Sequence, residues 1–316
     1  MQRAIASKSE GIAQGNSVLE ANGWPTDNVT FLRSIPAADF SSKMLSANNG
    51  GWSASLDDLV LSESAHSLYA DPSVKLNAES IIAGFNSMDG IYAEPFGMGS
   101  APKTDQEYKS LIEEFVQNET LQHRLHSHYY PPSDFAPYSF GPSVSYSSYE
   151  MAWWTMNSDV CVLCPTLKLA EQLSSNEAEP AVFVYDFKGP RHNNSYRAHH
   201  VSEIPFVFHL EAAGEESLRI PWDQQLSDSM LSSWVNMGID GIPDITNRID
   251  DVDLEWTPFD AVEGNVMLFQ TEEGGLTNRL DFKLKYRDNV CDFWYNEAGE
   301  ATMYNVCWER NGETAS

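Results

Sequence analysis

The sequence has no long apolar run and no recognisable leader. No part of its 316 residues approaches the uninterrupted apolar stretch of about 18 residues that marks a transmembrane helix. The segment Met1-Gln-Arg-Ala-Ile-Ala-Ser-Lys-Ser9 lacks the apolar centre of a signal peptide. These absences predict a protein without a membrane span and, taken alone, a cytosolic one.

Basic residues are scarce as well. Lysine and arginine together number 19 against 46 aspartates and glutamates, which gives a net charge of −27. A surface this negative repels phosphate backbones and anionic lipids, so we expect no nucleic-acid partner. The apolar share of 42% and the nine tryptophans are sufficient for a large core, which excludes a disordered chain.

Cysteine is rare, and the spacing of the cysteines argues against zinc. The chain has four: Cys161, Cys164, Cys291 and Cys307. Cys161 and Cys164 form a Cys-x-x-Cys pair, but the other two stand sixteen positions apart (307 − 291 = 16). A structural zinc site normally needs a second close pair, so disulfides are favoured, with three complete pairings open.

Buried strands are predicted where short apolar runs end in polar loops. They are expected at residues 3–7, Ile81–Ser87, Ala181–Phe187 and Asn265–Gln270. Helices are expected between them. Residues 17–60 read as helical and loop-rich, and further helices are predicted over Thr104–Gln117, Val160–Leu173 and about Asp223–Gly238.

Two details complete this outline. Pro165 is placed in the first turn of its helix, where a missing N–H costs nothing, and residues 129–148 are predicted to be an irregular connector. The alternation of strands and helices predicts an α/β fold with a mostly parallel sheet. We expect one domain over residues 1–310 and a disordered tail at 311–316.

An acid and a base follow two of the predicted strands. Asp89 comes directly after the strand Ile81–Ser87, and His200 follows the strand Ala181–Phe187 after a polar loop. Functional residues of parallel sheets lie past the carboxyl ends of the strands, so these two side chains are expected to meet at one edge. They would form two thirds of a hydrolytic triad. After Glu203, the apolar segment Ile204–Phe208 is predicted to be extended.

The order of several short motifs resembles the carboxyl-terminal part of the type-B carboxylesterases, the cholinesterase-like α/β-hydrolases. Gly84-Phe-Asn-Ser-Met-Asp-Gly90 resembles the loop that carries the triad acid, and His200-x-x-Glu203-Ile-Pro-Phe206 resembles the motif of the base. Other landmarks occur in the same order along nearly the whole chain: Arg3-Ala-Ile5, Leu56-Asp-Asp-Leu-Val-Leu61, Ser158-Asp159 with Cys164-Pro165, Trp234 to Pro243, Trp256-Thr-Pro258 and Cys291-Asp-Phe-Trp294.

The resemblance implies an α/β-hydrolase-like fold in which Asp89 is the triad acid and His200 the general base. It also implies a Cys164–Cys291 disulfide, with Cys161 and Cys307 either bridged or free. The expected substrate is a small carboxylic ester, and no cofactor is expected. A disulfide implies the secretory pathway, in agreement with glycosylation triplets at Asn28, Asn118 and Asn193.

The family's Gly-x-Ser-x-Gly nucleophile motif is not found. The segments Gly15-Asn-Ser-Val-Leu19 and Gly141-Pro-Ser-Val-Ser145 lack the second glycine and a preceding strand, and the glycine-rich oxyanion loop is missing too. We therefore expect no nucleophile in this chain, a sheet without its amino-terminal strands and nucleophile elbow, and little activity alone. An amino-terminal partner half would complete it. The alternatives are a non-catalytic binding or adhesion protein and a truncated gene product.

Other polar clusters have simpler interpretations. His123, His126 and His128 offer no common helical face and no carboxylate among them, which predicts a solvated helix end and no metal site. His199 is interpreted as a neighbour of the base and Glu203 as structural. Acidic side chains that lack the glycine and spacing of a calcium loop are predicted to be solvated: Asp250, Asp251, Asp253 and Glu255. Trp153 and Trp154 are predicted to be packing residues.

Overall fold

The computed structural model contains two compact units. It describes residues 7–47, 55–63, 67–68, 71, 76–90, 101–129, 138–140, 144–175, 180–190, 198–210, 221–244, 255–272, 275–281, 288–299 and 302–303. One unit comprises residues 2–74 and 311–316, and the other residues 75–310 together with residue 1. Within the described residues, no helix is long and apolar enough to cross a membrane.

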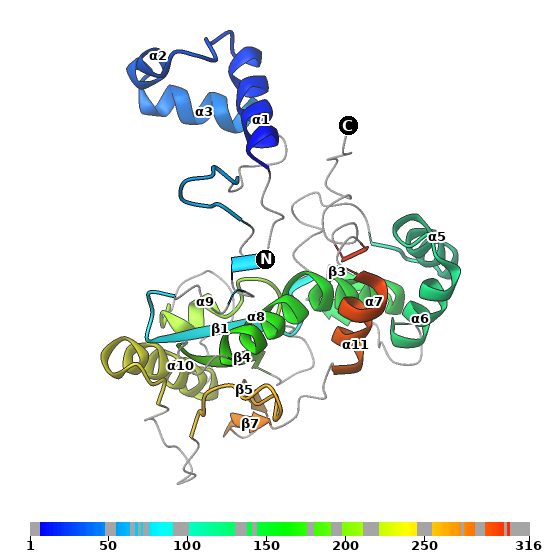
Figure 1. The fold of residues 1–316 in the computed structure, drawn as a ribbon. Helices are drawn as coiled ribbons and strands as arrows, with labels where there is room; N and C mark the ends of the chain where they lie inside the picture. The colour runs from blue at the N-terminus through cyan, green and yellow to red at the C-terminus, as the bar shows by residue number, and fades with distance from the viewer. Residues whose placement is uncertain are drawn as a thin grey trace. The chain divides into compact units, whose positions relative to one another are not determined.

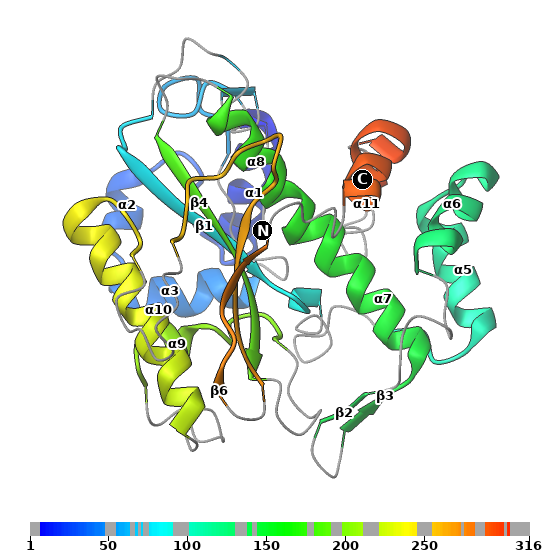
Figure 2. The ribbon, with the colours of Figure 1, turned by 90° about the horizontal axis from the view of Figure 1, so that it is seen from below.

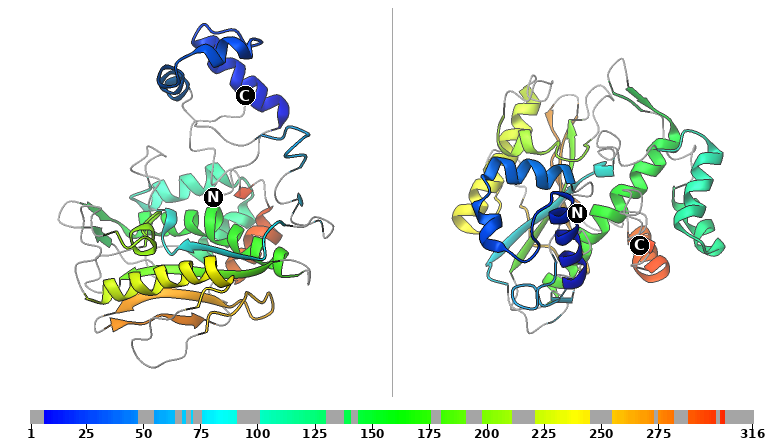
Figure 3. Two further views of the ribbon diagram at one scale, coloured as in Figure 1. Left: turned by 90° about the vertical axis from the view of Figure 1, so that its left-hand side faces the viewer. Right: turned by 90° about the horizontal axis from the view of Figure 1, so that it is seen from above.

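The smaller unit is helical (Figure 3). Its helices are α1 (Lys8–Ala21), α2 (Val29–Ser34) and α3 (Ala37–Ala47). Ser7 caps α1 in a reciprocal capping box with Glu10, and Trp24 stacks on Phe40 with ring centroids 5.7 Å apart. The helical, loop-rich segment predicted for this region is confirmed. The strand predicted at residues 3–7 lies outside the described residues, apart from Ser7.

The larger unit is built on a parallel sheet. The central strands are β1 (Ser80–Asn86), β4 (Ala181–Pro190) and β5 (Val266–Glu272), in the order β1-β4-β5 (Figure 1). Two short strands, β6 (Gly275–Leu276) and β7 (Arg279–Asp281), pair antiparallel to β5. The positions of the three central strands match three of the predicted apolar runs, so those strands are confirmed. The predicted burial holds for β4 and β5, but β1 is half-buried over residues 80–84.

Helices cover both faces of this sheet (Figure 2). On one face lie α9 (Ile204–Val207) and α10 (Pro221–Asp240), and on the other lies α8 (Cys164–Ser174). Beneath α9 and α10, a buried aromatic cluster contains Phe183, Phe187, Phe206, Trp256 and Phe269. The observed architecture is therefore the predicted α/β fold with helices on either side.

A long helix runs beside the sheet from Ser148 to Ser174. It consists of α7 (Ser148–Ser158), a π-helical turn η2 (Asp159–Leu163) and α8, so the predicted helix start at residue 160 is wrong. Pro165 follows the π turn, in which the Cys164 N–H donates to the Asp159 carbonyl. The wider turn lets the helix pass a proline that would otherwise end it.

Two further expectations need correction. The segment 129–148 is not wholly irregular, because β2 (Tyr138–Phe140) and β3 (Val144–Tyr146) form an antiparallel ribbon within it. The apolar run from Ile204 is helical, not extended, since it forms α9. Consecutive apolar residues carry no period that separates helix from strand, and Pro205 fits the first turn of a helix.

The remaining helices lie along this long helix. Helices α5 (Asp105–Phe115) and α6 (Glu119–Tyr129) contact α7, whereas α11 (Asp288–Asp292) contacts η2 and continues into the π-helical η4 (Phe293–Ala298). The helix predicted over Thr104–Gln117 is thus confirmed as α5, with Thr104 and Glu107 forming a capping box. The Cys164–Cys291 disulfide implied by the resemblance is present and joins α8 to α11. Cys161 is also disulfide-bonded, and Cys307 lies outside the described residues.

Candidate active site

Asp89 stands in the turn that follows β1. Its carboxylate is buried at 4% exposure, and its Oδ2 accepts a hydrogen bond from the Asn86 backbone N–H at 2.8 Å. The next residue is fixed too, because the Gly90 N–H donates to Ser158 Oγ at 2.8 Å on helix α7. The turn therefore holds the acid in place from both ends.

His200 is brought to this turn by an extension of the parallel pairing beyond β1 and β4. The Met88 N–H donates to the Ala198 carbonyl at 2.8 Å, and Met88 and His199 form a parallel bridge. Consequently His200 Nδ1 lies 2.8 Å from Asp89 Oδ1. The two side chains that were expected to meet do so, and their catalytic roles remain a prediction.

This contact sets the protonation of the imidazole. The hydrogen bond that His200 donates to Asp89 raises the pKa of His200 above its ordinary value of 6.5, burial opposes that change, and the charges of Asp89 and Glu203 add to it. A hydrogen bond to a carboxylate requires a proton on Nδ1, which makes Nε2 the basic nitrogen of the neutral ring. That is the tautomer a general base needs.

Further polar groups lie around the Asp89–His200 pair. The Asn86 side-chain amide donates to Glu203 Oε2 at 2.5 Å, which agrees with a structural role for Glu203. Sequence reasoning did not single out Asn86, although its place at the carboxyl end of a buried strand was a usable signal. Two buried oxygens here, Asn86 Oδ1 and Ser202 Oγ, have no hydrogen-bond partner among the described residues.

The backbone after the imidazole is strained. Val201 has a φ of 64°, in the left-handed region that β-branched residues rarely occupy. The conformation closes a tight turn in which the Ser202 N–H donates to the His199 carbonyl at 3.1 Å. Strain of this kind persists only where the surrounding structure enforces it, and it is common beside functional side chains.

The candidate serine of the first segment, Ser17, lies inside helix α1 and so does not form a nucleophile elbow. The candidate serine of the second segment, Ser143, is not among the described residues, and Ser145 after it lies in β3. Gly141 and Pro142 fall outside the described residues as well.

His209, Ser227 and Asp228 also lie close together, but they do not have the geometry of a catalytic triad. His209 Nδ1 lies 3.2 Å from Ser227 Oγ and 3.3 Å from Asp228 Oδ1. Both contacts use the same ring nitrogen, whereas a triad places the acid and the nucleophile on opposite nitrogens. The Ser227 hydroxyl is buried and donates to the Phe206 carbonyl at 2.8 Å.

The other predicted site residues are dispersed. His126 packs against Tyr108 and His128 against Phe293, so the expected solvated helix end is wrong for these two. His199 Nδ1 contacts the His200 carbonyl, and Trp153 and Trp154 are buried, as predicted. No cluster of metal-binding side chains occurs in the part of the chain that the structure describes.

The remaining predicted residues are surface residues or are not described. Asn28 and Asn118 are exposed at helix starts, where their side chains accept backbone hydrogen bonds. Glu255 is exposed. Four of these predictions fall outside the described residues: Asn193, Asp250, Asp251 and Asp253.

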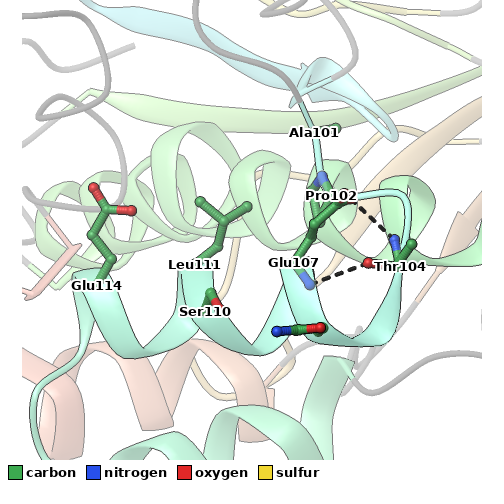
Figure 4. A pocket seen from close by; sticks show the side chains of 8 residues that line it. Ala101, Pro102, Thr104, Glu107, Ser110, Leu111 and Glu114 are labelled. Carbon is green, nitrogen blue, oxygen red and sulfur yellow. Dashed lines mark hydrogen bonds between the residues drawn. The ribbon is translucent and has the colours of Figure 1, made fainter.

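A hollow of about 400 Å³ lies along helix α5 (Figure 4). Its lining includes Ala101, Leu111 and Glu114, and it shares no residue with the Asp89–His200 pair. The Glu107 carboxylate in its wall already accepts the Thr104 N–H at 3.2 Å as part of the helix cap. The hollow therefore does not include the Asp89–His200 pair.

The geometry agrees with the comparison with protein families. The model of the carboxylesterase family matches residues 2–294. The chain belongs to the carboxylesterase family. No curated protein matches it significantly.

Solved esterase structures resemble the chain in fold. A PNB esterase has a TM-score of 0.60 at 16% identity, and the match covers 91% of this chain and 55% of the esterase. A thermophilic PNB esterase gives 0.59 at 16% with the same coverages, and another PNB esterase structure gives 0.61 at 14%, covering 91% and 54%. The fold is that of the α/β-hydrolases, and the chain spans about half the length of these esterases.

Proposed function

We propose that this chain supplies the acid and the base of a serine carboxylic-ester hydrolase. Asp89 is the acid and His200 is the base. The observation that carries the proposal is the 2.8 Å contact between His200 Nδ1 and Asp89 Oδ1, at the carboxyl ends of neighbouring parallel strands. Membership of the carboxylesterase family supports ester hydrolysis as the reaction.

In the complete enzyme, His200 moves the protons of acyl transfer. Its Nε2 takes the proton of a serine hydroxyl as that oxygen attacks the ester carbonyl, and then returns a proton to the leaving alcohol. Asp89 keeps the proton on Nδ1 and stabilises the imidazolium formed in between. The raised pKa of His200 follows from that same hydrogen bond. Water then releases the acid by the same route.

The serine and the oxyanion donors are proposed to come from another segment. The serine hydroxyls near Asp89 donate their hydrogen bonds to other groups: Ser158 Oγ donates to the Trp154 carbonyl at 2.7 Å, and Ser87 Oγ donates to Asp186 Oδ1 at 2.7 Å. Among the described strands, β1 pairs only with β4 and forms the outer edge of a parallel sheet. A strand added there would end beside Asp89, where a nucleophile is needed.

Hydrolysis of a short-chain chromogenic ester tests the proposal. The purified chain is expected to give no turnover that depends on His200. Turnover that disappears in His200→Ala but persists in His199→Ala would show that this chain contains its own nucleophile. The sequence upstream in the transcript decides the rest: an in-frame Gly-x-Ser-x-Gly supports the hydrolase, and a substituted serine there contradicts it and favours a binding protein.

We also propose that the chain works in an oxidising compartment. The disulfide between Cys164 and Cys291 and the exposed acceptors Asn28 and Asn118 support this location. Expression in a eukaryotic secretory system, followed by glycosidase treatment and mass spectrometry, tests it. Absence of glycan at both asparagines in the secreted protein would contradict the glycoprotein part of the proposal.

A further inference from the structure

Strand β4 carries a buried carboxylate that the proposed chemistry does not use. Asp186 has 0% exposure, and its partners in register on β1 and β5 are Phe85 and Leu268. Because side chains alternate along a strand, Asp186 shares a face with the buried Val182 and Val184. An apolar residue would suit this position in the sheet.

A carboxylate is energetically unfavourable at the buried position of Asp186. Burying a carboxylate costs several kcal/mol even after relaxation, unless charges and hydrogen bonds compensate it. Compensation is partial: Lys188 Nζ lies 3.4 Å from Asp186 Oδ2, and burial raises the pKa of Asp186 despite Lys188 and Ser87. Because burial of the Asp186 carboxylate is energetically unfavourable, its presence indicates a role beyond packing.

The group that Asp186 contacts is the first residue of the acid's turn. Ser87 Oγ donates to Asp186 Oδ1 at 2.7 Å, and the Ser87 N–H donates to the Phe187 carbonyl at 3.1 Å. Ser87 is therefore attached to β4 through both its side chain and its backbone. The turn that carries Asp89 begins at Ser87, so fixing Ser87 on β4 fixes the start of that turn.

We propose that Asp186 is a positioning residue, which holds Ser87 so that the Asp89 carboxylate stays on His200 Nδ1. This inference rests on the proposed pairing of Asp89 with His200. Asp186 touches no reacting atom in this scheme. It acts through the Ser87 hydroxyl and needs only an oxygen acceptor at the place of Oδ1.

The test measures the imidazole of His200 directly in the full chain. Nuclear magnetic resonance of ¹⁵N-labelled protein gives the pKa of His200 and the exchange rate of its Nδ1 proton. Asp89→Asn sets the scale, because it removes the carboxylate whose hydrogen bond and charge raise this pKa. Ser87→Ala and Asp186→Leu are expected to lower the pKa by at least half as much and to speed proton exchange. Asp186→Asn keeps an acceptor and is expected to behave like the wild type.

A matched control separates positioning from general stability. Ser233 is fully buried, whereas Ser87 is half-buried, and it donates to the Ser229 carbonyl at 3.0 Å inside α10, so Ser233→Ala removes a hydrogen-bonded hydroxyl elsewhere in the fold. It is expected to leave the His200 signals unchanged.

Each outcome of this experiment has one meaning. A wild-type pKa of His200 in Ser87→Ala overturns the positioning role, and this small substitution decides the matter if Asp186→Leu does not fold. An Asp186→Asn variant as impaired as Asp186→Leu also overturns it, because the charge would then matter and not the acceptor. If Asp89→Asn itself leaves His200 unchanged, the acid–base pair of the proposed function fails instead.

Discussion

Gly90 lies directly against the carbonyl oxygen of Trp154, so close that a Cβ at residue 90 would collide with that oxygen. The obstacle is backbone inside the long helix, which cannot move as a flexible side chain would. We therefore expect Gly90→Ala to destabilise the protein by about 1–3 kcal/mol, as overpacking does elsewhere. Chemical denaturation measures the change.

Gly238 provides the control for that substitution. It lies inside helix α10, and a Cβ added there would meet nothing within 4 Å. Alanine favours a helix interior over glycine by up to about 1 kcal/mol, so Gly238→Ala should be neutral or stabilising. Equal losses in the two variants would show that the Gly90 contact is not the cause.

The disulfide should contribute strongly to stability. Cys164 and Cys291 are 127 positions apart, and closing so large a loop restricts the unfolded chain. In the chain-entropy model a single cross-link of this span contributes about 4–5 kcal/mol, which is an upper bound here because Cys161 is disulfide-bonded as well. The paired substitution Cys164→Ala with Cys291→Ala should lower the free energy of unfolding by up to that amount. A denaturation midpoint unchanged in the double variant would contradict the expectation.

The Asp89–His200 contact predicts a specific pH dependence. Because Asp89 raises the pKa of His200 in the folded state, the contact stabilises the protein fully below pH 6.5, and that stability is lost as the pH rises through the raised pKa. The difference in unfolding free energy between the wild type and His200→Gln should therefore shrink from pH 5.5 to pH 8.5. The side chain is 32% exposed, so solvent screening limits the change to about 1 kcal/mol.

His199→Gln is the control for this titration. His199→Gln replaces the neighbouring imidazole and leaves His200 and Asp89 in place, so the pH dependence of its unfolding free energy should follow that of the wild type. A difference between wild type and His200→Gln that stays constant across the range would mean that the Asp89 contact is absent in solution.

Local patterns were sufficient to predict the elements that place the site. Ile81–Ser87 is predicted to be a strand because its residues up to Phe85 are apolar and a polar loop follows, and the observed strand spans Ser80–Asn86. Asp89 and His200 could be paired because both follow such strands, and neighbouring parallel strands end at one edge. The contact between Asp89 and His200 could therefore be predicted without predicting the structure of the chain that connects them.

Contacts set by tertiary packing could not be predicted in this way. The Asn86–Glu203 hydrogen bond joins residues 117 positions apart, and the Ser87–Asp186 bond joins residues 99 apart. Each depends on the exact register of β1 against β4, which apolar patterning does not specify. The position of Pro165 led to a wrong prediction of the helix start for a similar reason. Only the packed structure shows the π turn that lets the helix continue through this proline.

Val201 offers a test of strain beside the imidazole. Its φ of 64° costs an L-residue roughly 1–2 kcal/mol, a penalty that glycine does not incur. The residue is 37% exposed, so its removal loses less buried contact than the removal of a core valine would. We expect Val201→Gly to raise the free energy of unfolding by about 1 kcal/mol after the greater flexibility of glycine in the unfolded chain is included. Val201→Ala keeps the strain of a Cβ and should not stabilise the protein. A Val201→Gly variant no more stable than Val201→Ala would show that residue 201 does not hold this conformation in solution.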